Sequence, residues 1–213
     1  SFNNTEPVDY TAHALRESVA SVANLDPAEI EDVIIGTGHP EGCMGMNMGR
    51  IAAMSAGFPK EVAGTTVNRF CSSGSQAVMM AANTIVNEGA EVAIGAGVET
   101  ITMMQDGTQN TNRLVSASAR ERFPGLYFPM GITAEIVAER YGISREDQDL
   151  YALQSQQRYA AAAEAGQVAE EIAPMKVTRK VMKKGEDPYE EDFTVEKDEC
   201  NRPGTTLEAL NSL

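Results

Sequence analysis

The most constraining feature of this sequence is an alternation of strand-like and helix-like runs along its first hundred residues. Three short runs, at residues 33–36, 65–70 and 91–97, are predicted to be strands, and the first is apolar and reads as buried. Helical stretches rich in small residues separate them, at 50–55 and 75–87. Parallel strands need a crossover connection, which is usually a helix. The pattern therefore predicts an α/β fold with a mostly parallel sheet and helices on both faces.

The character of the chain changes after about residue 102. Residues 105–112 are polar and rich in turn formers, which is typical of a domain boundary. Two helices and two short strands are predicted beyond it, over residues 132–141, 144–165, 175–178 and 193–196. We therefore expect two domains, an α/β domain over residues 1–102 and an α+β domain over residues 103–213.

The net charge and the number of cysteines limit which partners the protein can bind and in which cellular compartment it is expected. The formal net charge of −14 disfavours non-specific binding to nucleic acid or to anionic membrane surfaces. No apolar run approaches the roughly 20 residues that span a bilayer, and the first residues do not resemble a signal peptide. An odd number of cysteines, three, argues against a disulfide framework and fits a reducing compartment. We therefore expect a cytoplasmic protein.

A local basic patch stands out against the acidic background. Five of the 17 basic residues fall between positions 176 and 184, namely Lys176, Arg179, Lys180, Lys183 and Lys184. Two interpretations stay open at this point. The patch is either a solvated charged hairpin, as most charge runs are, or a dock for the phosphates of a small anionic molecule.

Cys71 is the candidate for covalent chemistry. It directly follows a predicted strand and precedes a predicted helix, which places it at the carboxyl edge of the sheet, where α/β ligand sites form. A helix N-terminus favours negative charge, so it would stabilise a thiolate, and its N–H groups, with that of Cys71, can hold an oxyanion. The alternative is a buried and inert cysteine. Local context alone leaves both open.

Five motifs resemble those of the thiolase family, and they fall in that family's order. The first surrounds Cys71 at residues 67–77, Val-Asn-Arg-Phe-Cys-Ser-Ser-Gly-Ser-Gln-Ala. The other four are Gly-Ala-Gly-Val-Glu-Thr at 95–100, Met-Gly-Ile-Thr-Ala-Glu at 130–135, Ser-Arg-Glu-Asp-Gln-Asp at 144–149 and Arg-Pro-Gly-Thr-Thr-Leu-Glu at 202–208. Together they are spread over residues 67–208, so the chain resembles the N-terminal half of a thiolase together with the family's loop domain.

The resemblance implies an acyl-CoA acyltransferase. Thiolases load an acyl group from acyl-CoA onto a cysteine, to which Cys71 corresponds. They then pass it to CoA in degradation or to an acetyl-CoA carbanion in synthesis. Coenzyme A and acyl-CoA are thus the implied substrates, with no permanently bound cofactor and no metal. Pro129 stands where biosynthetic members often carry histidine, which favours a degradative 3-ketoacyl-CoA thiolase.

The resemblance also implies substrate contacts and a partner. Met130 corresponds to a residue near the acyl and pantetheine pocket. The basic stretch lies in the loop domain, where the family contacts the CoA nucleotide, so the implied binding residues include Arg179, Lys180 and Lys183. The strand from Thr65 to Phe70 resembles the edge strand that pairs across the family's dimer axis, which implies a homodimer or tetramer.

Several departures from the family bear on activity. The family's first strand and its whole C-terminal domain, with an asparagine, a histidine in Gly-His-Pro and a second cysteine, have no counterpart in the sequence. We therefore expect a fragment that is inactive alone and prone to associate. Gly38-His39-Pro40 has the same residues as the family's histidine motif, but it follows the first predicted strand and does not lie in a C-terminal domain. We therefore expect His39 to be a loop histidine. Cys43 and Cys200 match no motif, and a thiolate-directed reagent is expected to label Cys71 faster than either.

Two other functions remain as alternatives. One is a β-ketoacyl synthase-like condensing enzyme, against which the extended segment after Thr100, with its motif at 130–135, argues. The other is a non-catalytic CoA- or lipid-binding module on the thiolase fold. The intact Cys-Ser-Ser-Gly run at Cys71 argues against it.

Overall fold

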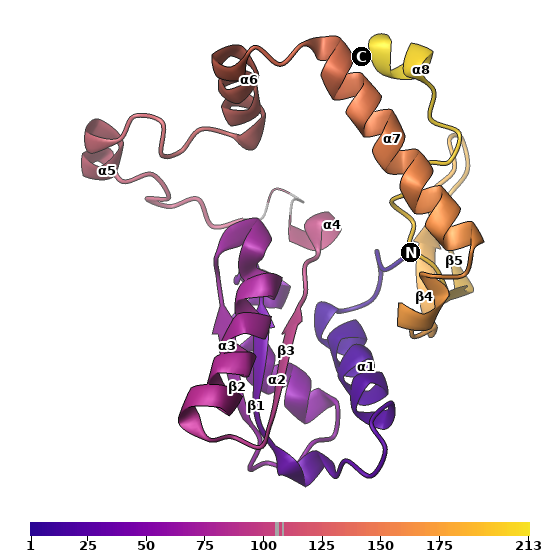
Figure 1. Cartoon of the computed structure of the whole chain (residues 1–213). Helices are drawn as coiled ribbons and strands as arrows, with labels where there is room; N and C mark the ends of the chain where they lie inside the picture. Colours follow the sequence, from indigo (N-terminus) through magenta and orange to yellow (C-terminus); the bar gives the residue numbers. More distant parts are fainter. Residues whose placement is uncertain (105–106, 108) are drawn as a thin grey trace. The chain divides into compact units, whose positions relative to one another are not determined.

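The computed structural model describes residues 1–104, 107 and 109–213 (Figure 1). The chain forms two compact units, which we call the α/β unit, Ser1–Gln109 with Ala173–Glu196, and the helical unit, Asn110–Ile172 with Lys197–Leu213. The predicted boundary at 105–112 includes residues 105, 106 and 108, which lie outside the described residues. The domains predicted over 1–102 and 103–213 stay a prediction. The two units differ from them in one respect, since contacts group residues 173–196 with the α/β unit.

The sheet of the α/β unit is parallel and has the strand order β2-β1-β3. These strands are β1 Ile30–Gly36, β2 Ala63–Val67 and β3 Val92–Gly97. The predicted α/β fold with a parallel sheet is thus confirmed. The expected strand from Thr65 to Phe70 was placed too late, because Asn68 begins a turn in which its side chain accepts a hydrogen bond from the N–H of Phe70 at 2.8 Å. This strand does lie at an edge of the sheet.

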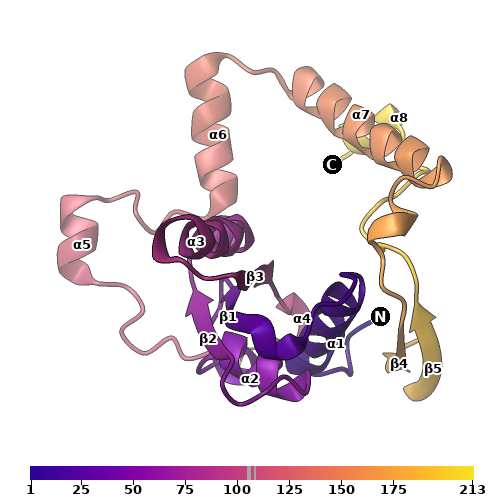
Figure 2. The ribbon, with the colours of Figure 1, turned by 60° about the horizontal axis from the view of Figure 1, so that its bottom comes forward.

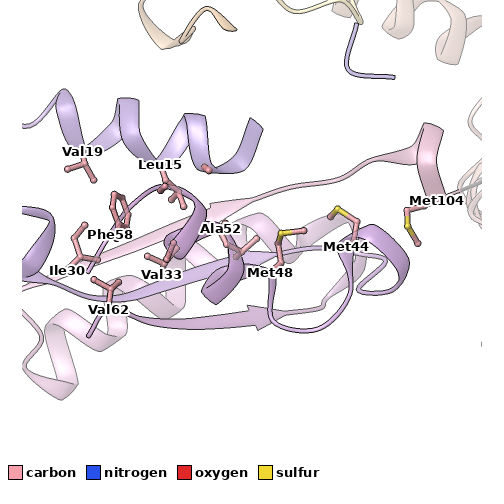
Figure 3. Packing of buried hydrophobic residues seen from close by; sticks show 14 residues of the cluster. Leu15, Val19, Ile30, Val33, Met44, Met48, Ala52, Phe58, Val62 and Met104 are labelled. Atoms are coloured by element: carbon pink, nitrogen blue, oxygen red, sulfur yellow. The ribbon is translucent and has the colours of Figure 1, made fainter. Parts of the chain in front are cut away.

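Helices cover both faces of the sheet, as Figure 2 shows. Helices α1 Pro7–Ala20 and α2 Met48–Ser55 lie on one face, and α3 Ser73–Glu88 lies on the other. Successive residues of a strand point to opposite faces. Accordingly, Val33 and Ile35 of β1 join the larger hydrophobic cluster beneath α1 and α2. Figure 3 shows that cluster. Ile34 packs against Ala77 and Ala81 of α3.

Helix α3 approaches the sheet closely because glycines face it. A Cβ atom at Gly36, the last residue of β1, would lie 2.2 Å from the backbone carbonyl carbon of Ser73. A Cβ atom at Gly95 of β3 would lie 2.5 Å from the Cα atom of Val78. Only glycine permits backbones to pack at this distance. The first turn of α3 is therefore held directly against the carboxyl end of β1.

A two-stranded antiparallel hairpin completes the α/β unit. It consists of β4 Met175–Val181 and β5 Tyr189–Val195, which are longer than the strands predicted there. The Asn3 side chain joins the hairpin to the N-terminal segment, since it donates to the carbonyl of Lys180 at 2.8 Å and accepts from its N–H at 3.1 Å. A ring nitrogen of His13 in α1 lies 3.2 Å from the carbonyl oxygen of Ala173.

The helical unit is built around one long helix, α7 Arg145–Glu164. Ser144 caps it, as the sequence predicts, since its hydroxyl oxygen accepts from the N–H of Asp147 at 3.0 Å. Arg145 pairs with the buried Asp149 at 2.9 Å and donates to the carbonyl of Leu210. The unit's other helices are α5 Ala117–Arg122, α6 Met130–Tyr141, η4 Ala169–Glu171 and α8 Leu207–Asn211. No helix that the structure describes could cross a membrane.

Candidate active site

Cys71 lies between the end of β2 and the start of α3. It is the middle residue of a single 3₁₀ turn, η3 Phe70–Ser72, which continues into α3 at Ser73. Its side chain is exposed, so the alternative that this cysteine is buried is wrong. The sheet is parallel and Cys71 follows one of its strands, so the expected place at the carboxyl edge is confirmed. Cys71 directly precedes Ser72, the N-cap residue of α3.

A network of short hydrogen bonds holds the turn that carries Cys71. The buried Ser73 accepts the N–H of Arg69 at 2.8 Å and donates its hydroxyl to the carbonyl of Phe70 at 2.6 Å. Ser72 donates to the carbonyl of Arg69 at 2.9 Å. Phe70 adopts a φ of 48°, which is uncommon for a residue with a side chain and is sustained only when neighbours enforce it. The serines after the cysteine therefore set its orientation.

Cys71 opens onto a cavity of about 430 Å³ at the carboxyl edge of the sheet. The ends of β1 and β3, the loops that follow them and the first residues of α3 supply its walls. Three titratable side chains line it, those of His39, Cys71 and Glu99. His39 lies in the loop after β1, as the sequence predicts, and it lines the same cavity as the nucleophile candidate.

Glu99 shapes this cavity. One carboxylate oxygen accepts the N–H of Gly38 at 2.7 Å, and the other accepts the hydroxyl of the buried Thr37 at 3.4 Å. The carbonyl of Glu99 accepts the hydroxyl of Tyr10 at 3.3 Å. Burial raises the pKa of Tyr10 above its ordinary value, which keeps the phenol a donor. Sequence reasoning placed Glu99 in a motif but assigned it no role, because its partners lie 61 and 62 residues away in the chain.

The basic residues between 176 and 184 lie on the hairpin, and two of them, Arg179 and Lys180, are opposite acidic residues of β5. Arg179 pairs with Glu191 at 3.3 Å, and its guanidinium lies 3.8 Å from the centre of the Phe193 ring. Lys180 is opposite Glu190 in the strand register. Lys183 lies over the ring of Tyr189 at 5.3 Å. Arg179 thus already has partners, while Lys180, Lys183 and Lys184 are exposed.

The remaining candidates lie elsewhere. Met130 is the first residue of α6 in the helical unit and is exposed, whereas Cys71 belongs to the α/β unit. Cys43 and Cys200 are exposed as well, and the sulfur of Cys43 lies 3.9 Å from that of Met104. Met104 ends the short helix α4 Ile101–Met104. Within the described part of the chain, no three His, Cys, Asp or Glu side chains gather as metal ligands would.

The sequence matches known proteins along its whole length. A family model described as the N-terminal domain of thiolase matches residues 1–213. The chain is 38% identical to a 3-ketoacyl-CoA thiolase of Bacillus subtilis, over 100% of the chain and 54% of that protein. It is 40% identical to the peroxisomal 3-ketoacyl-CoA thiolase 2 of Arabidopsis thaliana and 38% identical to the peroxisomal 3-ketoacyl-CoA thiolase of Homo sapiens. Both alignments include the whole chain, and they cover 45% of the Arabidopsis protein and 48% of the human protein. The chain spans about half the length of the curated relatives it matches.

Proposed function

Because this chain belongs to the thiolase family, we propose that it carries the nucleophile of an acyl-CoA acyltransferase and that Cys71 is the residue acylated. The observation that carries the proposal is the placement of an exposed Cys71 on a rigid turn, beside the N-cap of α3 and open to a cavity. Relatives named 3-ketoacyl-CoA thiolase favour cleavage of a 3-ketoacyl-CoA as the reaction. The match to a thiolase model weakens the alternative of a β-ketoacyl synthase-like enzyme.

The proposed step is acyl transfer to sulfur. The Cys71 thiolate attacks the carbonyl carbon of a thioester, a new S–C bond forms, and the carbonyl oxygen carries the negative charge of a tetrahedral intermediate. This intermediate collapses when the old C–S bond breaks, and CoA leaves as a thiolate that takes up a proton. The N-terminus of α3 favours negative charge, so it stabilises the attacking thiolate. The N–H groups of Phe70 and Ser72 in the same turn are already engaged, by the Asn68 side chain and by the carbonyl of Arg69. The donor that we propose for the oxyanion is therefore the N–H of Cys71 itself.

Acyl capture tests this function directly. The protein is incubated with acetyl-CoA and digested, and the Cys71 peptide is analysed by mass spectrometry. We expect an acetyl adduct on Cys71 and none on Cys43 or Cys200. Because all three thiols are exposed, accessibility alone would not produce this selectivity. A protein that binds acetyl-CoA without any adduct would instead be the non-catalytic CoA-binding module.

We further propose that the hairpin contacts the phosphates of CoA through its exposed lysines. Arg179 is held by Glu191 and Phe193, so it supports the strand, and Lys180, Lys183 and Lys184 supply the free charge. In an enzyme that combines this chain with a thiolase C-terminal domain, we expect the double variant Lys183→Glu/Lys184→Glu to raise the Michaelis constant for acyl-CoA several-fold at low salt, with little change in turnover. The difference from wild type should shrink at high salt, where exposed charges are screened.

A matched double variant separates this contact from a general charge effect. Lys60 and Lys197 are also exposed lysines outside the hairpin. Reversing both changes the net charge by the same amount, and we expect it to leave the Michaelis constant unchanged. Equal effects of the two double variants would show that the hairpin is only a solvated charged surface.

Association through the edge of the sheet is also part of the proposal. Strand β2 is an edge strand, and such strands present unpaired backbone groups to a second chain. The α/β unit also exposes large apolar side chains on α3, including Val78, Met79 and Val86. Both features favour a homo-oligomer, in which a second copy of this chain covers β2. The cytoplasmic location stays a prediction, while the names of the plant and human relatives include the word peroxisomal.

A further inference from the structure

Sulfur-bearing side chains are concentrated in two segments of the α/β unit that lie apart from the turn of Cys71. The first segment runs from the end of β1 to the first residue of α2 and carries Cys43, Met44, Met46 and Met48. The second is the short helix α4, which ends on Met103 and Met104. Helix α4 packs against the 3₁₀ turn η2 Gly42–Met44 of the first segment. The fold thus brings together sulfur atoms that are distant in the sequence.

A cavity of about 220 Å³ lies where these two segments meet. Its lining residues, none of which lines the cavity of Cys71, are Glu41, Gly42, Cys43, Met103, Met104 and Gln109. The sulfur of Cys43 lies 3.9 Å from the sulfur of Met104, although the two residues are 61 positions apart. Met103 offers a third sulfur in the same cavity. One thiol and two thioethers therefore share a single small cavity.

The thioether of Met104 has a fixed place at the inner wall of this cavity. Met104 is buried and lies at one end of the larger hydrophobic cluster, as Figure 3 shows. A Cβ atom at Gly42 would lie 3.5 Å from its sulfur and 3.7 Å from its terminal methyl group, so the backbone of Gly42 passes close to the thioether. Cys43, by contrast, is exposed. The two sulfurs therefore have the protein on one side and solvent access on the other.

We propose that Cys43 and Met104 bind a single soft metal ion, Cu(I), with Met103 as a third ligand. Thiolate and thioether sulfur select Cu(I), whereas zinc takes thiolate, imidazole and carboxylate ligands. Two sulfur ligands that each lie about 2.3 Å from one metal ion are about 3.8–4.0 Å apart at tetrahedral or trigonal angles. The separation of the two sulfurs in this structure, 3.9 Å, falls in that range. They therefore need little movement to accept the ion.

Binding exchanges one proton for one metal ion. The thiol of Cys43 releases its proton to water as its sulfur binds Cu(I), and no electron is transferred. The charge of the thiolate cancels that of the ion, and thioethers are neutral, which suits a cavity with a buried apolar wall. The site goes beyond the proposed function, since the ion lies outside the cavity of Cys71 and takes no part in acyl transfer.

The test measures how Cu(I) protects each cysteine of the 213-residue chain from alkylation by iodoacetamide. The protein is kept under anaerobic conditions at a Cu(I) concentration buffered with bicinchoninate, and the alkylated peptides are analysed by mass spectrometry. We expect Cu(I) to slow the alkylation of Cys43 at least about ten-fold, because a metal-bound thiolate is a poor nucleophile. Cys71 and Cys200 should react almost as before, and no methionine that the structure describes lines the cavity of Cys71. Zn²⁺ at the same free concentration should protect Cys43 far less.

Replacing the thioether tests its part in the site. Met104→Leu removes the sulfur and keeps the volume of the side chain nearly constant. We expect this variant to need at least about ten-fold more Cu(I) for the same protection of Cys43. Met48→Leu is the matched control, because Met48 is buried in the same hydrophobic cluster but does not line the cavity. It should behave as wild type, and a urea unfolding curve shows whether each variant folds.

Three results would overturn the metal site. Equal protection of all three cysteines by Cu(I) would show that an exposed thiol is sufficient to bind the ion. Protection by Zn²⁺ as strong as that by Cu(I) would contradict a site built on thioethers. The same Cu(I) requirement in wild type and Met104→Leu would show that the thioether contributes nothing. If Met104→Leu does not fold, the wild-type pattern still decides, through its selectivity for Cys43 and for Cu(I).

Discussion

Replacing Cys71 by serine is expected to lower the rate of acyl capture from acetyl-CoA by at least about a thousand-fold. The α3 N-terminus can stabilise a thiolate, because a thiol lies within reach of ionisation near neutral pH. A hydroxyl is a far weaker acid, and the same helix end leaves it neutral. The serine is nearly the same size, and Cys71 is exposed, so the fold should be unaffected.

The measurement is a quenched time course of the acyl adduct, followed by peptide mass spectrometry. Cys43→Ser and Cys200→Ser are the matched controls, because both thiols are exposed and lie outside the cavity. We expect the wild-type rate in each. A Cys71→Ser protein that forms the adduct at the wild-type rate would contradict the assignment and move the acylated residue elsewhere.

Gly36→Ala is expected to lower the free energy of unfolding by about 3 kcal/mol or more. The new methyl group would lie 2.2 Å from the backbone carbonyl of Ser73, so α3 would have to move away from β1. The backbone of Ser73 cannot move aside as easily as the end of a flexible side chain. Since Ser73 holds the turn of Cys71 through Arg69 and Phe70, the displacement should also slow the alkylation of Cys71.

Gly89→Ala is a control at the other end of the same helix. Gly89 is the C-cap of α3 with a φ of 85°, and a Cβ atom there would meet nothing within 4 Å. Its substitution therefore costs only the left-handed backbone conformation, about 1 kcal/mol. Urea unfolding of both variants, with the Cys71 labelling rate, separates the steric effect from a general glycine effect. Equal losses of stability would contradict the close packing of α3 on β1.

Much of the fold was predictable because the local patterns agree with the global topology. Residues 33–36 and 91–97 are apolar runs bounded by turn signals, and the structure has β1 and β3 there. The late placement of the next strand arose from local turn chemistry. The predicted strand ran on through residues 68–70, but the Asn68 side chain accepts the N–H of Phe70 and β2 ends at Val67.

The contacts between the hairpin and the α/β unit could not be predicted from the spacing of apolar residues along the chain. The two strands of the hairpin were predicted, but their attachment to the α/β unit depends on Asn3, which lies 177 positions from Lys180. The partners of its basic residues were also hidden, because the opposition of Lys180 to Glu190 follows from the antiparallel register. A count of charges along the chain therefore overstated the free positive charge of the hairpin.

The sequence by itself determined the class of fold, the family and the position of the candidate nucleophile. All three can be read from residues that are close together in the sequence, because strands and helices alternate along the chain and Cys71 lies between a strand and a helix. Only the tertiary structure decided what surrounds that cysteine. Gly36 lets α3 reach the sheet, and Asn68 and Glu99 draw the His39 loop to the same edge. Such contacts join residues that are distant in sequence, and a parallel sheet brings them together because the carboxyl ends of its strands share one edge.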